Sequence, residues 1–146
     1  MSTVSVSTEL PISAEHAWRL AQKPEMLEYV LAPIIRMTGP GLPDRLEAGV
    51  SGTARMWMFG VIPAWKHHIT VVRLEPTESY TNEHGGPIRV WNHRLTFTPL
   101  GDNRCRYTDE IEIEDGWRAF GLRQFVTFLF RHRQRRWRTF ARIIAD

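Results

Sequence analysis

The chain has 146 residues, of which 42% are hydrophobic and 24% are charged, a balance typical of soluble globular proteins. No part of it resembles a low-complexity or repeat segment, and its length is that of one ordinary domain, so we expect a single domain over residues 1–146. The longest apolar stretch, residues 125–130, is far shorter than the roughly 20 residues that span a bilayer, which argues against membrane insertion.

The single cysteine, Cys105, cannot form an internal disulfide, and a lone cysteine within a predicted strand is typical of a small buried hydrophobic residue. Residues 1–10 lack the basic start and apolar block of a secretory signal. A cytoplasmic location is therefore the default expectation.

The positive charge is local. The net charge is only +3, and the arginines gather around Trp137, at Arg131, Arg133, Arg135, Arg136 and Arg138. Such a cluster could contact phosphates on nucleic acid or on a membrane surface. Cations near a helix C-terminus are also favourable in themselves, so we expect no specific nucleic-acid partner.

The N-terminal quarter predicts one strand and two short helices. Residues 3–10 alternate in polarity, as a half-buried strand does. Ser13 can accept a hydrogen bond from the first turn of a helix over 14–22, and Pro24 suits the first turn of a second helix that ends near Pro33. Residues 34–37 read as a short strand, and residues 39–44 as an exposed, turn-rich loop.

The middle of the chain reads as five further strands, over 52–59, 65–74, 79–84, 89–99 and 104–114. The separators, at 62–63, 76, 85–87 and 101–103, are plausible turns between adjacent antiparallel strands. After Gly116 the apolar spacing becomes helical and predicts a helix over 118–144, roughly 40 Å long.

The last two strands and the final helix carry the motifs "GPIRVWNHRLTF", "CRYTDEIEIEDG" and "FLFRHRQRRW". Together with the order of elements, they resemble the helix-grip fold of the START-related, or SRPBCC, superfamily, which includes polyketide cyclase/dehydrase-like proteins. The resemblance rests on Trp91, His93, Thr108, Asp109, Phe130 and Arg133. It implies an α+β fold in which a curved antiparallel sheet of about six to seven strands wraps around a long C-terminal helix.

The resemblance also implies a cavity between sheet and helix. Inward positions of the predicted strands and helix supply apolar walls and a few convergent polar groups, as small-molecule pockets do. The candidate ligand-binding residues are Met56, Met58, Trp65, His67, Trp91, His93, Leu95, Tyr107, Asp109, Ile111, Val126, Leu129 and Arg133.

For several of these residues the sequence leaves two interpretations open. His93 and Asp109 could act on a ligand or form a core hydrogen bond under the helix. Arg133 interrupts the apolar stripe of the helix, where it could pair with Asp109 or extend to solvent. His67 and His68 are adjacent on a strand and point to opposite faces, so we expect no metal site with His93.

Two functions remain open. The first is binding of an apolar or aromatic small molecule, without any cofactor. The alternative is an enzyme of the cyclase, dehydrase or aromatase type, in which His93 and Asp109 move protons. The sequence is compatible with a homodimer and names no ligand.

Overall fold

The computed structural model of the chain describes residues 1–38, 47–114, 116–117 and 119–145. The predicted loop over 39–44 and the predicted helix start at Arg118 lie outside these residues. In chain order the elements are β1 (Ser2–Leu10), α1 (Ala14–Ala21), α2 (Pro24–Leu31), β2 (Ile35–Thr38), β3 (Ser51–Met58), β4 (Ile62–Glu75), β5 (Glu78–Gly85), β6 (Ile88–Pro99), β7 (Cys105–Ile113) and α3 (Ala119–Ala145).

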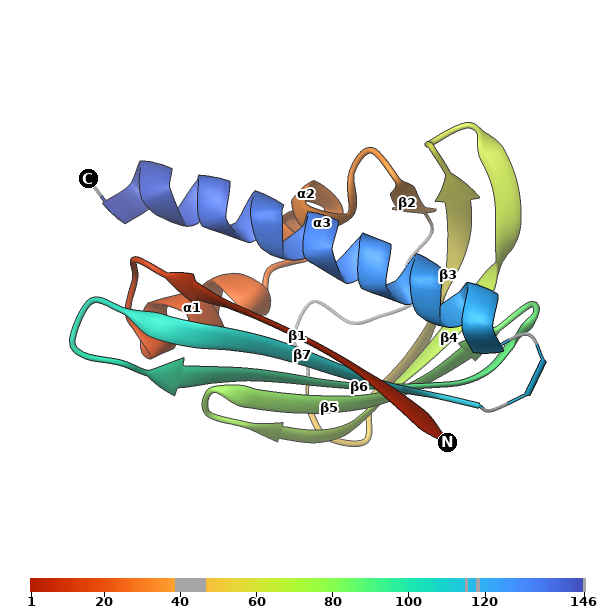
Figure 1. Cartoon of the computed structure of the whole chain (residues 1–146), viewed down its shortest axis with the longest axis horizontal. Coiled ribbons are helices and arrows are strands. Elements are labelled where there is room, and N and C mark those ends of the chain that lie inside the picture. The colour runs from red at the N-terminus through yellow and green to blue at the C-terminus, as the bar shows by residue number, and fades with distance from the viewer. Residues whose placement is uncertain (39–46, 115, 118, 146) are drawn as a thin grey trace.

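The strands form one antiparallel sheet of seven, in the order β1-β7-β6-β5-β4-β3-β2. Figure 1 shows α3 lying across one face of this sheet, with α1 and α2 on the same side as α3. The predicted helix-grip architecture is confirmed. None of the described helices has an apolar stretch long enough to cross a membrane.

The sheet bends because three of its strand pairs contain irregularities in register. They fall between Arg55 and Trp57 in β3, between Val71 and Arg73 in β4, and between Glu83 and Gly85 in β5. An extra residue on one strand bends that strand and increases its twist. The β3–β4 end of the sheet therefore curls toward the start of α3, as Figure 1 shows.

One predicted boundary was wrong. The turn expected at Ile62 and Pro63 lies earlier, at Phe59 and Gly60, whose φ angles are 54° and 76°, and β4 begins at Ile62. Proline is tolerated in β4 because β5 pairs with this strand only from His68 onward, so Pro63 has no ladder partner on that side.

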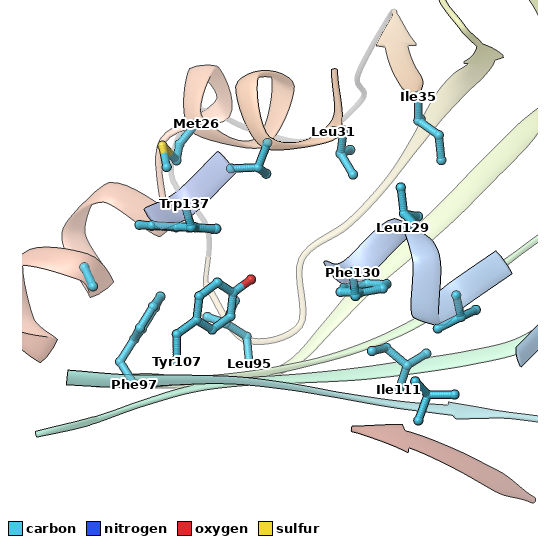
Figure 2. Packing of buried hydrophobic residues seen from close by; sticks show 14 of the residues in the cluster. Met26, Leu31, Ile35, Leu95, Phe97, Tyr107, Ile111, Leu129, Phe130 and Trp137 are labelled. Atoms are coloured by element: carbon cyan, nitrogen blue, oxygen red, sulfur yellow. The ribbon is translucent and has the colours of Figure 1, made fainter. Parts of the chain in front are cut away.

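An aromatic cluster joins the sheet to the C-terminal half of α3. Phe97 and Tyr107 lie opposite each other on β6 and β7, and both rings lie within 6 Å of the Trp137 ring, at centroid distances of 5.6 and 5.5 Å. Figure 2 shows Trp137 above these two rings, and Phe130 and Leu129 on the part of α3 that is nearer its N-terminus. Edge-to-face contacts of this kind stabilise beyond the area they bury.

The aromatic cluster generates a stability prediction. Phe97 is 1% exposed, so Phe97→Ala should lower the free energy of unfolding by about 3–5 kcal/mol through lost contacts and a residual cavity. Urea denaturation followed by circular dichroism measures this loss. The matched control is Phe128→Ala on the outer face of α3, where the side chain is 60% exposed and the change should stay within about 0.5 kcal/mol. Equal midpoints for the two variants would contradict the packing described for Phe97.

Candidate functional site

A cavity of about 180 Å³ lies between the concave face of the sheet and α3, closed at one end by α1 and α2. Its walls come from β2 to β6 and all three described helices. Of the residues predicted to contact a ligand, the structure places eight on its walls: Met56, Trp65, His67, Trp91, His93, Leu95, Leu129 and Arg133.

The other five predicted residues do not line this cavity. Tyr107, Asp109, Ile111 and Val126 are fully buried in the core, and Met58 packs at the edge of the core, at the hairpin end of β3. The reason is the position of α3, which packs directly on β1 and β7 and leaves no space above β7. The cavity opens only above the strands further along the sheet.

His93 and Asp109 form a close pair behind the cavity wall. His93 on β6 lies opposite Ile111 of β7, and Asp109 lies opposite Leu95, so the pair are diagonal neighbours on the same face. The distance from Nε2 of His93 to Oδ1 of Asp109 is 2.6 Å. His93 lines the cavity and Asp109 does not, so this carboxylate can act on a ligand only through the imidazole.

Asp109 is also connected to α3. Its Oδ2 accepts a hydrogen bond of 3.2 Å from Nε2 of Gln134, which also donates to the backbone oxygen of Val6 on β1 at 2.7 Å. Arg133 donates from Nε to the Tyr107 hydroxyl at 3.1 Å. That hydroxyl in turn hydrogen-bonds to Asp109. Arg133 therefore reaches Asp109 through Tyr107, and it neither pairs with the carboxylate directly nor extends to bulk solvent.

This network shifts the ionisation of its members. Burial acts to raise the pKa of Asp109, but the charge of Arg133 and the hydrogen bonds from His93 and Tyr107 outweigh it and hold the pKa below its ordinary value. Burial acts to lower the pKa of Arg133, and Tyr107 and Asp109 raise it above its ordinary value. The carboxylate and guanidinium are both charged at neutral pH.

A second pair of the same type lies on the neighbouring strands. Nε2 of His67 on β4 is 2.9 Å from Oε1 of Glu83 on β5. Thr81 donates a hydrogen bond of 2.7 Å to the other oxygen of the same carboxylate. His67, Glu83 and Thr81 all line the cavity, and Thr81 lies directly opposite His93. The cavity thus carries two histidine–carboxylate pairs on four consecutive strands.

Two glycines allow Trp65 to lie beside this second pair. A Cβ atom at Gly85 would lie 2.4 Å from the backbone oxygen of Lys66, and one at Gly86 would lie 2.7 Å from Cβ of Trp65. Because glycine has no Cβ atom, the β5–β6 turn can lie against Trp65. The indole nitrogen of Trp65 then donates to Nδ1 of His67 at 3.1 Å.

Sequence reasoning missed Thr81, Glu83 and Gln134. β5 is polar on both faces, so alternation gave no signal for which side of it points inward. Gln134 did carry a signal, because it stands four residues after Phe130 and three before Trp137, on the apolar stripe itself. A polar residue on such a stripe is buried with a partner, here Asp109.

The remaining candidate groups belong to the structure rather than to the cavity. His68 faces away from His67 and stacks on His84 at a centroid distance of 4.7 Å. Burial raises the pKa of the Cys105 thiol to about 11, which keeps it protonated. Among the described residues, no group of three or more His, Cys, Asp or Glu side chains is placed to hold a metal ion.

Much of the arginine cluster makes contacts within the chain. Arg136 donates to the backbone oxygen of Tyr29 at 2.8 Å and lies over its ring, and Arg138 donates to the Thr8 hydroxyl at 2.9 Å. Arg131 and Arg135 are exposed on the outer face of α3.

The lowered pKa of Asp109 generates a prediction about pH. A carboxyl group whose pKa is lower in the folded state stabilises the fold above its unfolded pKa, and this stabilisation is lost as the pH falls through the folded value. Asp109→Asn should therefore lower the free energy of unfolding by about 2 kcal/mol at pH 7, the scale of a charge-assisted hydrogen bond. Urea titrations should show the difference from wild type narrowing as the pH falls below about 4, the ordinary pKa of the carboxyl group. A difference that stays the same as the pH is lowered would show that ionisation of Asp109 does not contribute.

Solved structures with similar folds cover nearly the whole chain. A START superfamily protein from Mycobacterium smegmatis matches with a TM-score of 0.72 and 13% identity over 97% of this chain and 98% of its own. Protein CV1439 from Chromobacterium violaceum matches with a TM-score of 0.72 and 13% identity over 93% and 94%. Norcoclaurine synthase from Thalictrum flavum matches with a TM-score of 0.68 and 10% identity over 98% and 86%. At these identities the likeness establishes the fold alone.

The fold is thus of the SRPBCC type, as the sequence motifs indicated. No curated protein sequence matches the chain significantly. One family model does, over residues 8–140, and its description is a domain of unknown function, DUF8410. Because this match covers most of the chain, the protein belongs to the DUF8410 family.

Proposed function

We propose that residues 1–146 form one domain that binds an apolar or aromatic small molecule in the cavity between the sheet and α3. The observation that supports this most directly is the composition of the cavity wall. Aromatic and aliphatic side chains from both layers surround a few polar groups that converge on the interior, His67, Glu83, His93 and Arg133. This mixture is the usual make-up of small-molecule sites.

The volume limits the size of the ligand. An engineered apolar cavity of about 150 Å³ accommodates benzene, and the cavity here is about 180 Å³. A ligand with one ring and a short substituent fits without rearrangement. Norcoclaurine synthase, one of the proteins with a similar fold, has been solved in complex with dopamine and hydroxybenzaldehyde, and ligands of one aromatic ring on this scaffold are consistent with the proposal.

Binding can be tested with nitrobenzene, a single-ring apolar compound that quenches tryptophan fluorescence. The wild type should show a saturable quenching component, which Trp91→Phe reduces because Trp91 lines the cavity together with Trp18 and Trp65. The matched control is Trp117→Phe, since Trp117 is 86% exposed and lies outside the cavity. Native mass spectrometry of the purified protein then searches for a copurified molecule. Quenching that never saturates in the wild type would argue against the binding site.

The second candidate function is proton transfer by His93, as in the cyclase or dehydrase alternative. The supporting observation is the arrangement of its ring: Nε2 is bound to Asp109, and within the described part of the chain Nδ1 makes no hydrogen bond. A carboxylate that fixes one imidazole nitrogen leaves the other available as a general base or acid. The ring is 11% exposed and lines the cavity, within reach of a ligand there.

The two functions are separated by measuring affinity and turnover together, with whichever molecule native mass spectrometry identifies. If His93 transfers a proton, His93→Gln should lower turnover by about 100-fold or more and leave binding nearly unchanged. Asp109→Asn should give a smaller loss of turnover, because Asp109 acts through His93. Loss of affinity without any detectable reaction in the wild type supports binding alone.

A further inference from the structure

Glu83 places a carboxylate on the wall of the cavity. It is 13% exposed, lines the cavity and accepts hydrogen bonds from His67 and Thr81. Burial acts to raise the pKa of Glu83, but the hydrogen bond and charge of His67, the charge of His93 and the hydrogen bond from Thr81 hold it below its ordinary value. A charged carboxylate therefore faces the interior of an apolar cavity at neutral pH.

His67 donates one hydrogen bond to this carboxylate. The indole N–H of Trp65 can only donate, so Nδ1 of His67 must accept and carries no hydrogen. The ring hydrogen is then on Nε2 and points at Glu83. His67 therefore contributes one N–H hydrogen bond to the carboxylate.

The guanidinium of Arg133 forms no ion pair with Glu83. It donates to Tyr107, lies 5.3 Å from the Phe130 ring centroid, and is balanced through Tyr107 by the charged Asp109. Among the described residues no arginine or lysine nitrogen lies within 4 Å of Glu83. Two carboxylates, Glu83 and Asp109, thus stand against one guanidinium around the cavity, and the direct partners of Glu83 are a histidine and a threonine. A buried charge in this position gains strongly from a cation in contact with it.

The walls beside Glu83 also suit a cation. Trp91 lies directly opposite Glu83 on the adjacent strand, and its ring is 6.0 Å from that of Phe130. Trp65 lies on the other side of His67, with the two ring centroids 6.5 Å apart. Indole faces attract organic ammonium groups, and aromatic cages are the arrangement by which proteins recognise quaternary ammonium ligands.

We propose that the ligand of this cavity is a small organic ammonium compound with one aromatic ring, and that Glu83 binds its cationic nitrogen beside Trp91. The inference rests on the proposed binding function and adds the charge of the ligand to it. The ring occupies the apolar end formed by residues such as Leu95 and Leu129. The remaining acceptor sites of the Glu83 carboxylate receive N–H groups of the ligand.

The experiment compares three probes of similar size and different charge: benzylammonium, benzyl alcohol and benzoate, with toluene as the apolar reference. Isothermal titration calorimetry at pH 7 and low salt gives each dissociation constant. The wild type should bind benzylammonium about 10- to 100-fold more tightly than benzyl alcohol, the usual scale for one buried charge pair. Benzoate should bind most weakly, because it adds a second negative charge beside Glu83.

The variant Glu83→Gln removes the charge and keeps the shape. The amide oxygen of glutamine can still accept from His67, and its NH₂ group can donate to the Thr81 hydroxyl, so both native partners stay satisfied. This change should abolish the preference for benzylammonium and leave benzyl alcohol binding within about twofold. Glu78→Gln is the matched control on the same strand, because Glu78 pairs with Arg94 and does not line the cavity. It should bind all four probes as the wild type does.

Each outcome bears on the proposal. If toluene and benzyl alcohol bind and benzylammonium binds no more tightly, the cationic ligand is wrong and the cavity remains a binding site for neutral molecules. If benzoate binds most tightly, Arg133 rather than Glu83 sets the charge of the ligand. If none of the four binds, both this inference and the proposed function fail. If Glu83→Gln does not fold, the comparison of the four probes on the wild type still tests the charge of the ligand.

Discussion

The structure depends on one buried carboxylate. Asp109 connects three strands and the long helix, because His93 on β6 and Gln134 on α3 both bond to it and Gln134 also bonds to the backbone of β1. Arg133 supplies the compensating charge through Tyr107. A buried ion without such partners would destabilise the fold by several kcal/mol. Satisfying Asp109 therefore fixes where α3 crosses the sheet, and with it which residues border the cavity.

The position of the helix explains why the cavity exists and why it lies to one side. Over β1 and β7, α3 packs closely and apolar side chains fill the space, with Ile111 and Val126 fully buried. Further along, the three irregular strand pairs turn β3 to β5 away from a straight continuation. A straight helix cannot follow a sheet that bends beneath it. The space that remains between them is the cavity, and the short helices α1 and α2 close one end of it.

Much of this architecture could be predicted from the sequence, because strong alternation in β6 and β7 identified the inward faces and helical spacing identified the stripe of α3. The fold followed from those patterns, as did the candidates Trp91, His93, Leu95 and Leu129 on the cavity wall. Strand alternation could not tell which inward residues lie under the helix and which lie under empty space, so Tyr107, Asp109 and Ile111 were placed on a wall when they belong to the core. Glu83 was missed because β5 is polar on both faces, and only the order of strands in the sheet reveals its inward side.

The two histidine–carboxylate pairs differ in a way that assigns them different tasks. In the pair on β4 and β5, both ring nitrogens of His67 are occupied, by Trp65 and by Glu83, so this imidazole can orient the carboxylate and has no nitrogen free to exchange a proton with a ligand. In the pair on β6 and β7 the carboxylate is buried and only the imidazole of His93 reaches the cavity. The first pair therefore presents an anion to the interior, and the second presents a base or acid. Because Thr81 on β5 lies opposite His93 and donates to Glu83, the two groups are a fixed distance apart on adjacent strands. In the proposed binding mode, a ligand held by Glu83 lies near the imidazole of His93, so binding by the first pair precedes the proton transfer proposed for the second.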